Sequence, residues 1–339
     1  MTAASSRNLE VSMKRCKATL LAAIFAWLLV SAFGCLPAEA QALAYVTNGD
    51  SKTVSVINTA TNTVAATVPV GSGPSEVAFT PNGAFAYVAN FSSSTVSVIK
   101  TATNTVVATV PVGDSPVEVA ITPNGAFAYV ANGESSTVSV IKTATNTVVA
   151  TVPVGSGPSE VAITPNVAIT PNGAFAYVTN GDSNTVSVIN TATNTVVATV
   201  PVGDSPVKVA ITPNGAFAYV TNGDSSTVSV INTATNTVVA TVPVGSRPSE
   251  VAFTPNGAFA YVANRGSKAV SVINTATNTV VATVLVGSGP REVAITPNGA
   301  FAYVPNGDSN TVSVIKTATN TVVATVPVGH APDGVAITP

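Results

Sequence analysis

Short apolar runs separated by polar turns recur along most of this sequence. In one copy, VAIT (residues 119–122) is followed by a Pro-Asn-Gly turn, FAYVAN (127–132), TVSVI (137–141) and TVVATVPV (147–154). β-Branched and aromatic residues dominate all four runs, whereas Gly, Pro and Asn fill most of the turns between them. The pattern predicts four short strands in each copy and no helix.

The second run of each copy predicts how the sheets pack. FAYV is apolar at both alternating phases, with Phe and Tyr on one side and Ala and Val on the other. A strand of this kind has both of its faces buried. We therefore expect each four-stranded sheet to lie between two neighbouring sheets.

The copies repeat with a nearly constant period. Every tyrosine of the chain occupies the same place in its copy, and successive tyrosines are 42 residues apart except for one interval of 48. These tyrosines are Tyr45, Tyr87, Tyr129, Tyr177, Tyr219, Tyr261 and Tyr303. A period near 40 to 45 residues with short strands is typical of β-propellers, in which each copy forms one blade.

The two ends of the repeat region predict how the ring closes. The region begins at Leu43 with a second strand that no first strand precedes, and it ends with a first strand, Val335–Thr338, that nothing follows. A C-terminal strand joining the N-terminal blade would complete that blade. We expect an all-β, seven-bladed β-propeller over residues 41–339, with four antiparallel strands per blade.

Two local departures from the repeat carry predictions. Six copies have proline near the end of the exposed fourth strand, where it blocks edge pairing with other molecules, but the sixth copy has Leu285. The edge at Leu285 is therefore expected to be the most prone to association. The 48-residue interval contains VAITPN twice, at 161–166 and 167–172, and either copy could form the first strand.

The N-terminal segment has the features of a secretory signal peptide. Basic residues precede an apolar run at 18–34, and an Ala-Glu-Ala sequence at 38–40 follows it. We expect residues 1–40 to be removed before Gln41, leaving no transmembrane segment in an exported protein located outside the cell, at its surface or in the periplasm. The alternatives are an uncleaved anchor, for which the run is somewhat short, and a lipoprotein acylated at Cys35.

Composition narrows the chemistry of the mature chain. Both cysteines, Cys16 and Cys35, and the only tryptophan, Trp27, lie in the leader. From Gln41 onward nine Lys or Arg residues stand against thirteen Asp or Glu residues, a net charge of −4. Because the basic residues are scattered singly along the sequence, we expect no nucleic-acid partner.

The repeated words resemble a known family. YVTN at Tyr45, Tyr177 and Tyr219, varied to YVAN or YVPN in the other copies and followed by VSVI and TATNTVVATVPVG, resembles the YVTN-repeat β-propeller family. The resemblance covers essentially all of residues 42–339. It implies a secreted or cell-surface protein of bacteria or archaea, such as a surface-layer protein, mostly without an assigned reaction.

One set of candidate binding residues lies on loops that vary among the copies. The loop after YVxN and the loop before each first strand differ from copy to copy, and in a propeller both lie on one face. The candidates on this variable loop face are Asp50, Phe91, Glu134, Asp182, Asp224, Arg265 and Asp308.

A second set forms the expected acidic rim of the central channel. Its members, which come just before the first strands, are Glu76, Glu118, Glu160, Glu250 and Glu292, with Lys208 and Gly334 interrupting the acidic ring at the other two positions. Several carboxylates around one mouth could attract Ca²⁺. We favour the other interpretation, a solvated acidic rim that contributes solubility.

The absence of familiar catalytic motifs favours a noncatalytic function. His330 is the only histidine, and no catalytic sequence motif of a hydrolase or a phosphate-binding loop occurs. The leading hypothesis is a secreted or surface scaffold that binds protein or glycan through the variable loop face, without catalytic residues or cofactor. The alternative is a channel-centred hydrolase or lyase of the lactonase-like type, using the rim glutamates or His330, with or without a divalent cation. A redox-cofactor propeller is a third hypothesis, which the lack of Cys, Trp and further His disfavours.

Overall fold

The computed structural model describes residues 43–58, 63–163 and 173–328, together with residues 330, 332 and 335. The chain divides into two compact units. The larger unit, Tyr45–Val56 and Ala66–Pro339, holds nearly all of the strands. The smaller unit, Met1–Ala44 and Ile57–Ala65, contributes to the described ranges only terminal residues of the first three strands.

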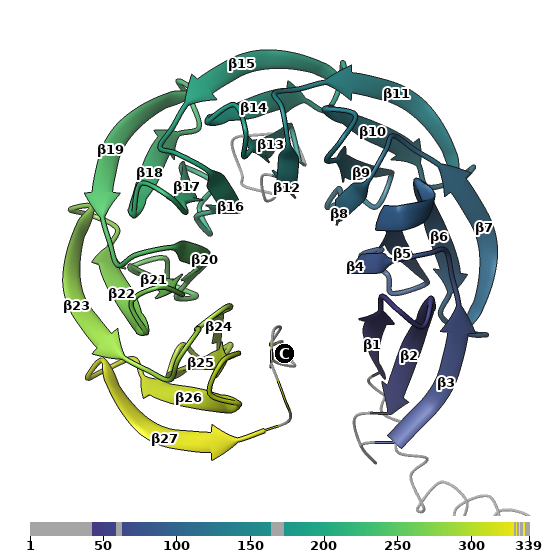
Figure 1. The fold of residues 1–339 in the computed structure, drawn as a ribbon. Coiled ribbons are helices and arrows are strands. Elements are labelled where there is room, and N and C mark those ends of the chain that lie inside the picture. Colours follow the sequence, from purple (N-terminus) through teal and green to yellow (C-terminus); the bar gives the residue numbers. More distant parts are fainter. Residues whose placement is uncertain are drawn as a thin grey trace, which may run out of the picture. The chain divides into compact units, whose positions relative to one another are not determined.

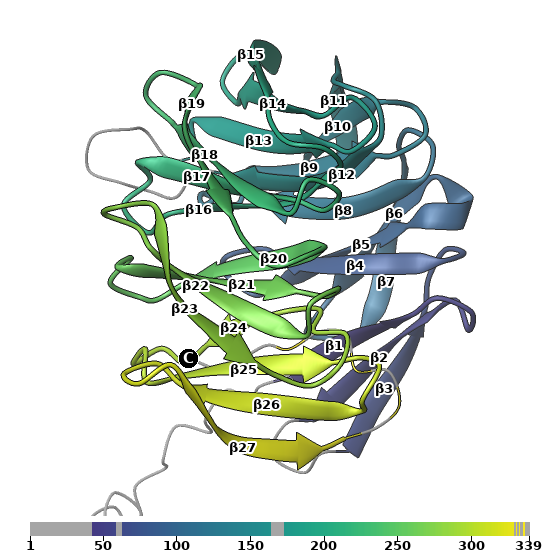
Figure 2. The ribbon, with the colours of Figure 1, turned by 60° about the vertical axis from the view of Figure 1, so that its left-hand side comes forward.

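Antiparallel sheets succeed one another along the chain, and in the larger unit their first strands lie innermost around a common centre (Figures 1 and 2). The first sheet contains β1 (Leu43–Asn48), β2 (Thr53–Asn58) and β3 (Thr63–Pro69). The next three are β4 (Pro74–Phe79), β5 (Phe85–Asn90), β6 (Thr95–Lys100) and β7 (Thr105–Pro111); β8 (Pro116–Ile121), β9 (Phe127–Asn132), β10 (Thr137–Lys142) and β11 (Thr147–Pro153); and β12 (Pro158–Ile163), β13 (Phe175–Asn180), β14 (Thr185–Asn190) and β15 (Thr195–Pro201).

The remaining three sheets repeat the same order. They are β16 (Pro206–Ile211), β17 (Phe217–Asn222), β18 (Thr227–Asn232) and β19 (Thr237–Pro243); β20 (Pro248–Phe253), β21 (Phe259–Asn264), β22 (Ala269–Asn274) and β23 (Thr279–Leu285); and β24 (Ala294–Ile295), β25 (Phe301–Asn306), β26 (Thr311–Lys316) and β27 (Thr321–Pro327). The protein is thus an all-β, seven-bladed propeller, as the sequence predicts.

Two details differ from the sequence-based expectation, and a third expectation falls outside the described residues. The first strand of a blade begins earlier than predicted, at Pro116 instead of Val119, because pairing extends to a bulge near its start. A single turn of 3-10 helix, Phe91–Ser93, occupies the loop after β5, where no helix was expected. The predicted closing strand lies outside the described residues except for Val335, which is not in a strand.

The first copy of the duplicated VAITPN segment supplies residues of the first strand of its blade. Val161 pairs with Val178 and Ala162 with Tyr177, the same register in which Val119 and Ala120 pair with Val130 and Tyr129. The first three residues of the first copy therefore belong to the innermost strand. Residues 164–172, including the second copy, lie outside the described ranges.

Apolar clusters between consecutive blades form the core, as the two-sided FAYV pattern predicts. Tyr129, Val138 and Val140 of one blade pack with Val161, Val178 and Ile189 of the next, and all are buried. Burial of this apolar surface is the main stabilising contribution to the joint between blades.

A hydrogen bond that the sequence did not predict accompanies each of these joints. The hydroxyl of Tyr129 donates to Oδ1 of Asn194 in the next blade at 2.7 Å, and Tyr177 donates to Asn236 at the same distance. Each acceptor is the last residue of a TATN turn and has a left-handed backbone, with φ 54° at both residues. Equivalent bonds start from Tyr45, Tyr87, Tyr219 and Tyr261. The repeated Tyr and Asn therefore belong to one joint.

The glycine in the repeated PVG sequence is required by close packing. A Cβ atom on Gly113 would lie 2.7 Å from Nδ2 of Asn132, which is fully buried. The Asn132 amide in turn donates to Oγ of Ser139 at 3.0 Å. Any side chain at residue 113 would displace this buried network.

Candidate active site

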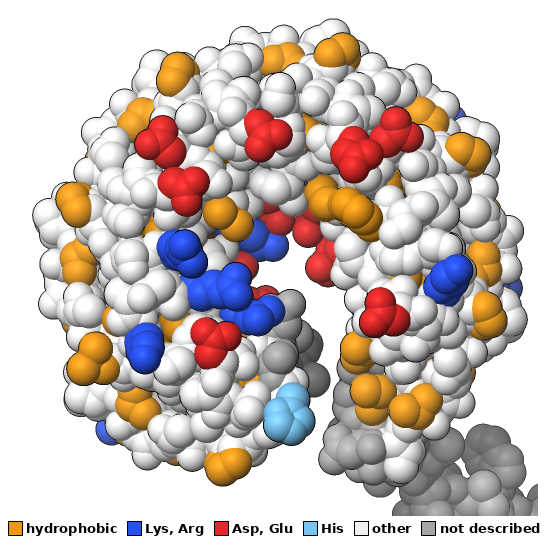
Figure 3. Space-filling model, viewed as in Figure 1, with side chains coloured by type: hydrophobic (Ala, Val, Ile, Leu, Met, Phe, Trp, Pro, Cys, Tyr) orange, Lys and Arg blue, Asp and Glu red, His pale blue; other side chains and the backbone are white. Residues whose placement is uncertain are grey.

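The innermost strands bring the rim glutamates toward the centre of the larger unit. Glu118 lies on β8, Glu160 on β12 and Glu250 on β20, and Lys208 lies at the same place on β16. In each strand the pairing register shifts just before this residue, which is the effect of a β-bulge. Bulges redirect side chains and are common beside active sites. Figure 3 shows both acidic and basic side chains around the central opening.

Lys208 makes the closest charged contact of this group. Its Nζ lies 2.8 Å from Oε2 of Glu160 and 3.9 Å from Oε2 of Glu250. The Glu160 side chain is 10% exposed, whereas that of Lys208 is 31% exposed and remains accessible from solvent. Burial alone would lower the pKa of Lys208, but the acidic groups around it, of which Glu160 has the largest effect, outweigh burial and raise the pKa above its usual value. The ammonium therefore stays charged.

The carboxyl groups around Lys208 differ in their protonation. Burial, and then the Glu160 carboxylate, raise the pKa of Glu118 well above its usual range, and Glu118 hydrogen-bonds to Glu160. Because Lys208 pairs directly with Glu160, Glu118 is the member of this carboxyl pair that holds the proton. Burial also raises the pKa of Glu250 to about 8, against the opposing effect of Lys208.

Glu118, Glu160, Lys208 and Glu250, here called the Glu–Lys cluster, thus combine a neutral acid, a carboxylate, a cation and a group that exchanges its proton near neutral pH. Pairs of titratable groups whose environments separate their pKa values are typical of general acid–base sites. The expectation of a fully solvated rim is wrong for these residues, because burial of the first strands also removes water from their carboxyl groups.

The other rim positions are arranged differently. Glu292 precedes β24, and its Oε2 accepts a hydrogen bond from the backbone N–H of Val335 at 2.6 Å. Glu76 lies on β4 and is partly buried. His330 is exposed. Gly334 lies outside the described residues. Within the described ranges no three His, Cys, Asp or Glu side chains have an arrangement that could hold a metal ion, so Ca²⁺ binding stays a prediction.

The seven candidates of the variable loop face are all exposed. Backbone hydrogen bonds join the two variable loops of one blade, as between Asp182 N–H and the Ser156 carbonyl at 3.3 Å and between Asp224 N–H and the Asp204 carbonyl at 3.2 Å. The face is therefore a continuous surface of paired loops. Its candidates are spread over different blades and do not converge on one point.

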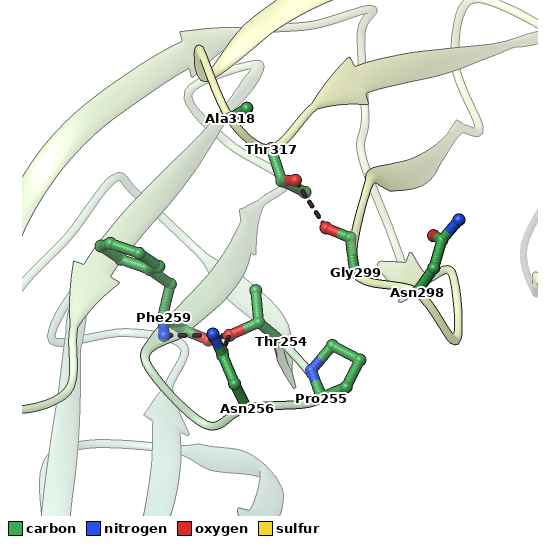
Figure 4. A pocket seen from close by; sticks show the side chains of 8 residues that line it. All are labelled: Thr254, Pro255, Asn256, Phe259, Asn298, Gly299, Thr317 and Ala318. Carbon is green, nitrogen blue, oxygen red and sulfur yellow. Dashed lines mark hydrogen bonds between the residues drawn. The ribbon is translucent and has the colours of Figure 1, made fainter.

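Two pockets lie away from the Glu–Lys cluster. One, of about 270 Å³, lies between turns of two adjacent blades and is lined by residues that include Thr254, Asn256, Phe259 and Thr317 (Figure 4). These residues belong to TPNGAF and TAT sequences that recur in most blades, and hydrogen bonds within the turns already engage them. The other, of about 330 Å³, lies beside Leu285. Neither contains an ionisable group.

Sequence reasoning found the individual rim residues but misjudged Lys208. It treated this lysine as a break in an acidic ring, whereas the structure places it in contact with two of the glutamates. The sequence does show that Lys208 replaces the Glu of other copies. That this lysine contacts glutamates of neighbouring blades could be learned only from the distances in the structure.

A sequence model of the family described as "Lactonase, 7-bladed beta-propeller" matches residues 36–151, 103–239 and 233–326. The chain belongs to this lactonase family.

Solved structures resemble this lactonase-family propeller over most of its length. Hydrazine synthase from Kuenenia stuttgartiensis is 26% identical, with a TM-score of 0.67, over 81% of this chain and 92% of that one. A functionally unknown protein from Desulfotomaculum acetoxidans DSM 771 is 21% identical, with a TM-score of 0.69, over 87% of this chain and 98% of that one. A proposed 6-phosphogluconolactonase from Bacteroides uniformis ATCC 8492 is 21% identical, with a TM-score of 0.66, over 86% of this chain and 96% of that one. The last two likenesses concern the fold alone. A search of characterised protein sequences gives no match.

The family match corrects the leading hypothesis from the sequence. The noncatalytic-scaffold interpretation is wrong, and the lactonase-type alternative is favoured. The contact of Lys208 with Glu160 and Glu250 makes the centre of this propeller chemically asymmetric. Across the described residues, no helix is long and apolar enough to span a membrane.

Proposed function

We propose that this lactonase-family propeller is a hydrolase that opens a cyclic ester at the Glu–Lys cluster. The observation that carries the proposal is the contact of Lys208 with two buried carboxyl groups, one of which also hydrogen-bonds to the protonated Glu118. Family membership supports the choice of a lactone as the substrate.

Each group has a role that follows from its protonation. Glu250, whose pKa is about 8, removes a proton from water as the water oxygen bonds to the lactone carbonyl carbon. The Lys208 ammonium stabilises the negative charge that develops on the carbonyl oxygen. As the ring C–O bond breaks, Glu118 supplies a proton to the departing oxygen, and the product is a hydroxy acid. Glu160 holds Lys208 and Glu118 in place.

Hydrolysis of γ- and δ-lactones by the full chain tests this function. We expect proton release with a ring-opened product, and a decrease of about 100-fold or more in the rate for Glu118→Gln and for Glu250→Gln, because general acid–base groups contribute about 10² to 10⁴. Asp114→Asn is the matched control, since Asp114 is an exposed carboxylate outside the cluster. Failure to open any lactone, or an active Glu118→Gln/Glu250→Gln double variant, refutes the proposal.

We also infer that the chain is a YVTN-repeat member of this family and that it is exported. The repeated YVTN motif and the N-terminal leader support these two inferences. Mass spectrometry of protein recovered outside the cytoplasm tests the second one. Recovery of a form that begins at Gln41 agrees with it, whereas retention of residues 1–40 on cytoplasmic protein contradicts it.

A further inference from the structure

A cluster of positive charge lies on the variable loop face, apart from the proposed site of hydrolysis. All three arginines that follow Gln41, namely Arg247, Arg265 and Arg291, come from the two adjacent blades built on β20–β23 and β24–β27. Lys268 belongs to the same loops. Figure 3 shows Lys and Arg side chains gathered beside the central opening, whereas Asp and Glu dominate another part of the same face.

Hydrogen bonds show that the three arginines belong to neighbouring loops. The N–H of Arg265 donates to the carbonyl of Arg247 at 2.9 Å. Ser249, two residues after Arg247, donates from Oγ to the carbonyl of Arg291 at 2.8 Å. Arg247, Arg265 and Lys268 are exposed, and none of them makes a salt bridge to another described residue. We call Arg247, Arg265, Arg291 and Lys268 the arginine patch.

Each arginine stands at a position where most other copies have an uncharged residue. Arg247 stands where the other copies have Gly, Ser or Ala, and Arg265 stands where most have Gly. Arg291 stands where the other copies have Ser or Val, except for Asp333 in the last copy. Arg247 has φ 51°, a left-handed backbone that Gly73, Gly157 and Gly289, and also Ser115 and Ser205, take at the same position of other blades. The loop therefore keeps one backbone shape while its side chain changes.

We propose that the arginine patch binds an acidic polysaccharide. Guanidinium groups form paired hydrogen bonds with carboxylate and sulfate groups, and several of them on one surface suit a chain with repeated anions. Serine residues of the same loops, such as Ser246 and Ser267, are exposed and offer hydroxyl groups to the sugar hydroxyls.

The surroundings of the patch disfavour a nucleic acid. Asp308 is exposed on the next loop, so a duplex, with one charge about every 1.7 Å, would also be repelled by neighbouring carboxylates. The loops 244–250, 264–268 and 286–293 contain no aromatic residue on which bases could stack. A glycan whose acidic groups are spaced farther apart is repelled less by these carboxylates and needs no stacking of bases.

Binding of homogalacturonan oligosaccharide to the full chain, measured by calorimetry at low and at physiological ionic strength, tests the proposal. The patch variant Arg247→Gly/Arg265→Gly/Arg291→Ser places in each position a residue found at that position in other blades, so that folding is preserved. The matched control Lys100→Asn/Lys142→Asn/Lys316→Asn removes three positive charges at another repeat position, where the remaining copies have Asn. The same oligosaccharide with its carboxyl groups methyl-esterified serves as the neutral ligand.

We expect the patch variant to bind at least tenfold more weakly and the control variant to bind within twofold of the unaltered protein. The esterified ligand should not bind. Absence of binding by the unaltered protein, an equal decrease in both variants, or tighter binding of a DNA oligonucleotide of equal charge overturns the proposal. This test is independent of the proposed hydrolysis, because homogalacturonan contains no lactone.

Discussion

Substitution of Lys208 by Glu gives the most direct test of the Glu–Lys cluster. Five of the other first strands carry Glu at this position, so Lys208→Glu restores the residue that the repeat prefers. A change toward the consensus commonly stabilises a protein. Here the structure predicts the opposite, because the substitution removes the ammonium that pairs with Glu160 and adds another carboxyl group to a buried acidic site.

The magnitude follows from the contact itself. At an effective dielectric constant of about 20, two unit charges separated by the 2.8 Å between Lys208 Nζ and Glu160 Oε2 attract by about 6 kcal/mol. Desolvation of the pair offsets part of this energy, and the ammonium retains some contact with water. Loss of one partner of a buried pair costs about 3–5 kcal/mol. Because Lys208 is partly exposed, we expect a destabilisation at the lower end of this range, about 3 kcal/mol.

Urea unfolding followed by far-UV circular dichroism measures this difference at pH 8 and at pH 5. We expect the deficit of Lys208→Glu to be smaller at pH 5 than at pH 8, because burial raises the pKa of Glu118, Glu160 and Glu250 and their mutual repulsion weakens as they take up protons. Lys208→Met, which removes the ammonium without adding a carboxyl group, should be intermediate at pH 8. Equal stability of Lys208→Glu and the unaltered protein at pH 8 would refute the assignment of Lys208 as the counterion of this cluster.

Three further predictions concern other parts of the molecule. Tyr177→Phe should lower the free energy of unfolding by about 1 kcal/mol, because it removes the hydrogen bond to Asn236. A double-mutant cycle with Asn236→Gly should show that the two effects are coupled, whereas additive effects would contradict an energetic contribution of this bond to the joint. Leu285→Pro should reduce aggregation measured by light scattering, since Leu285 is 75% exposed at the end of β23; unchanged aggregation counts against this edge. The raised pKa of Glu250 implies stability that is fully present below the unfolded value near 4.5 and is lost as pH rises through about 8; Glu250→Gln should flatten this part of the pH–stability curve, and an unchanged slope would argue against burial of the carboxyl group.

The strands were predictable because their pattern is local. FAYVAN at 127–132 is recovered as β9 without change, and its burial on both faces follows from the alternation of residues within a single strand. The position of a turn likewise depends on neighbouring Gly, Pro and Asn residues. These features require no knowledge of how one blade faces another.

The chemistry of the centre was not predictable in the same way. Glu118, Glu160 and Lys208 are separated by 42 and 48 residues, and only the arrangement of consecutive blades brings their side chains together. Each taken alone resembles a charged residue in a polar loop, so sequence reasoning assigned the glutamates to a solvated rim. The proximity of the arginines was hidden for the same reason, because scattered positions in the sequence become neighbours on one face.

The Tyr–Asn joint has a consequence for how such a chain can change in length. In the six joints that the described residues show, a copy brings the tyrosine that bonds to its successor and the asparagine that accepts from its predecessor, as Tyr129 and Asn146 do within one blade. A segment of one period that is gained or lost by recombination between copies therefore carries both halves of the connection and leaves the flanking connections matched. Blade number can vary by whole units without the simultaneous invention of a new interface, and interchangeable parts of this kind also explain why the copies have been able to remain so alike.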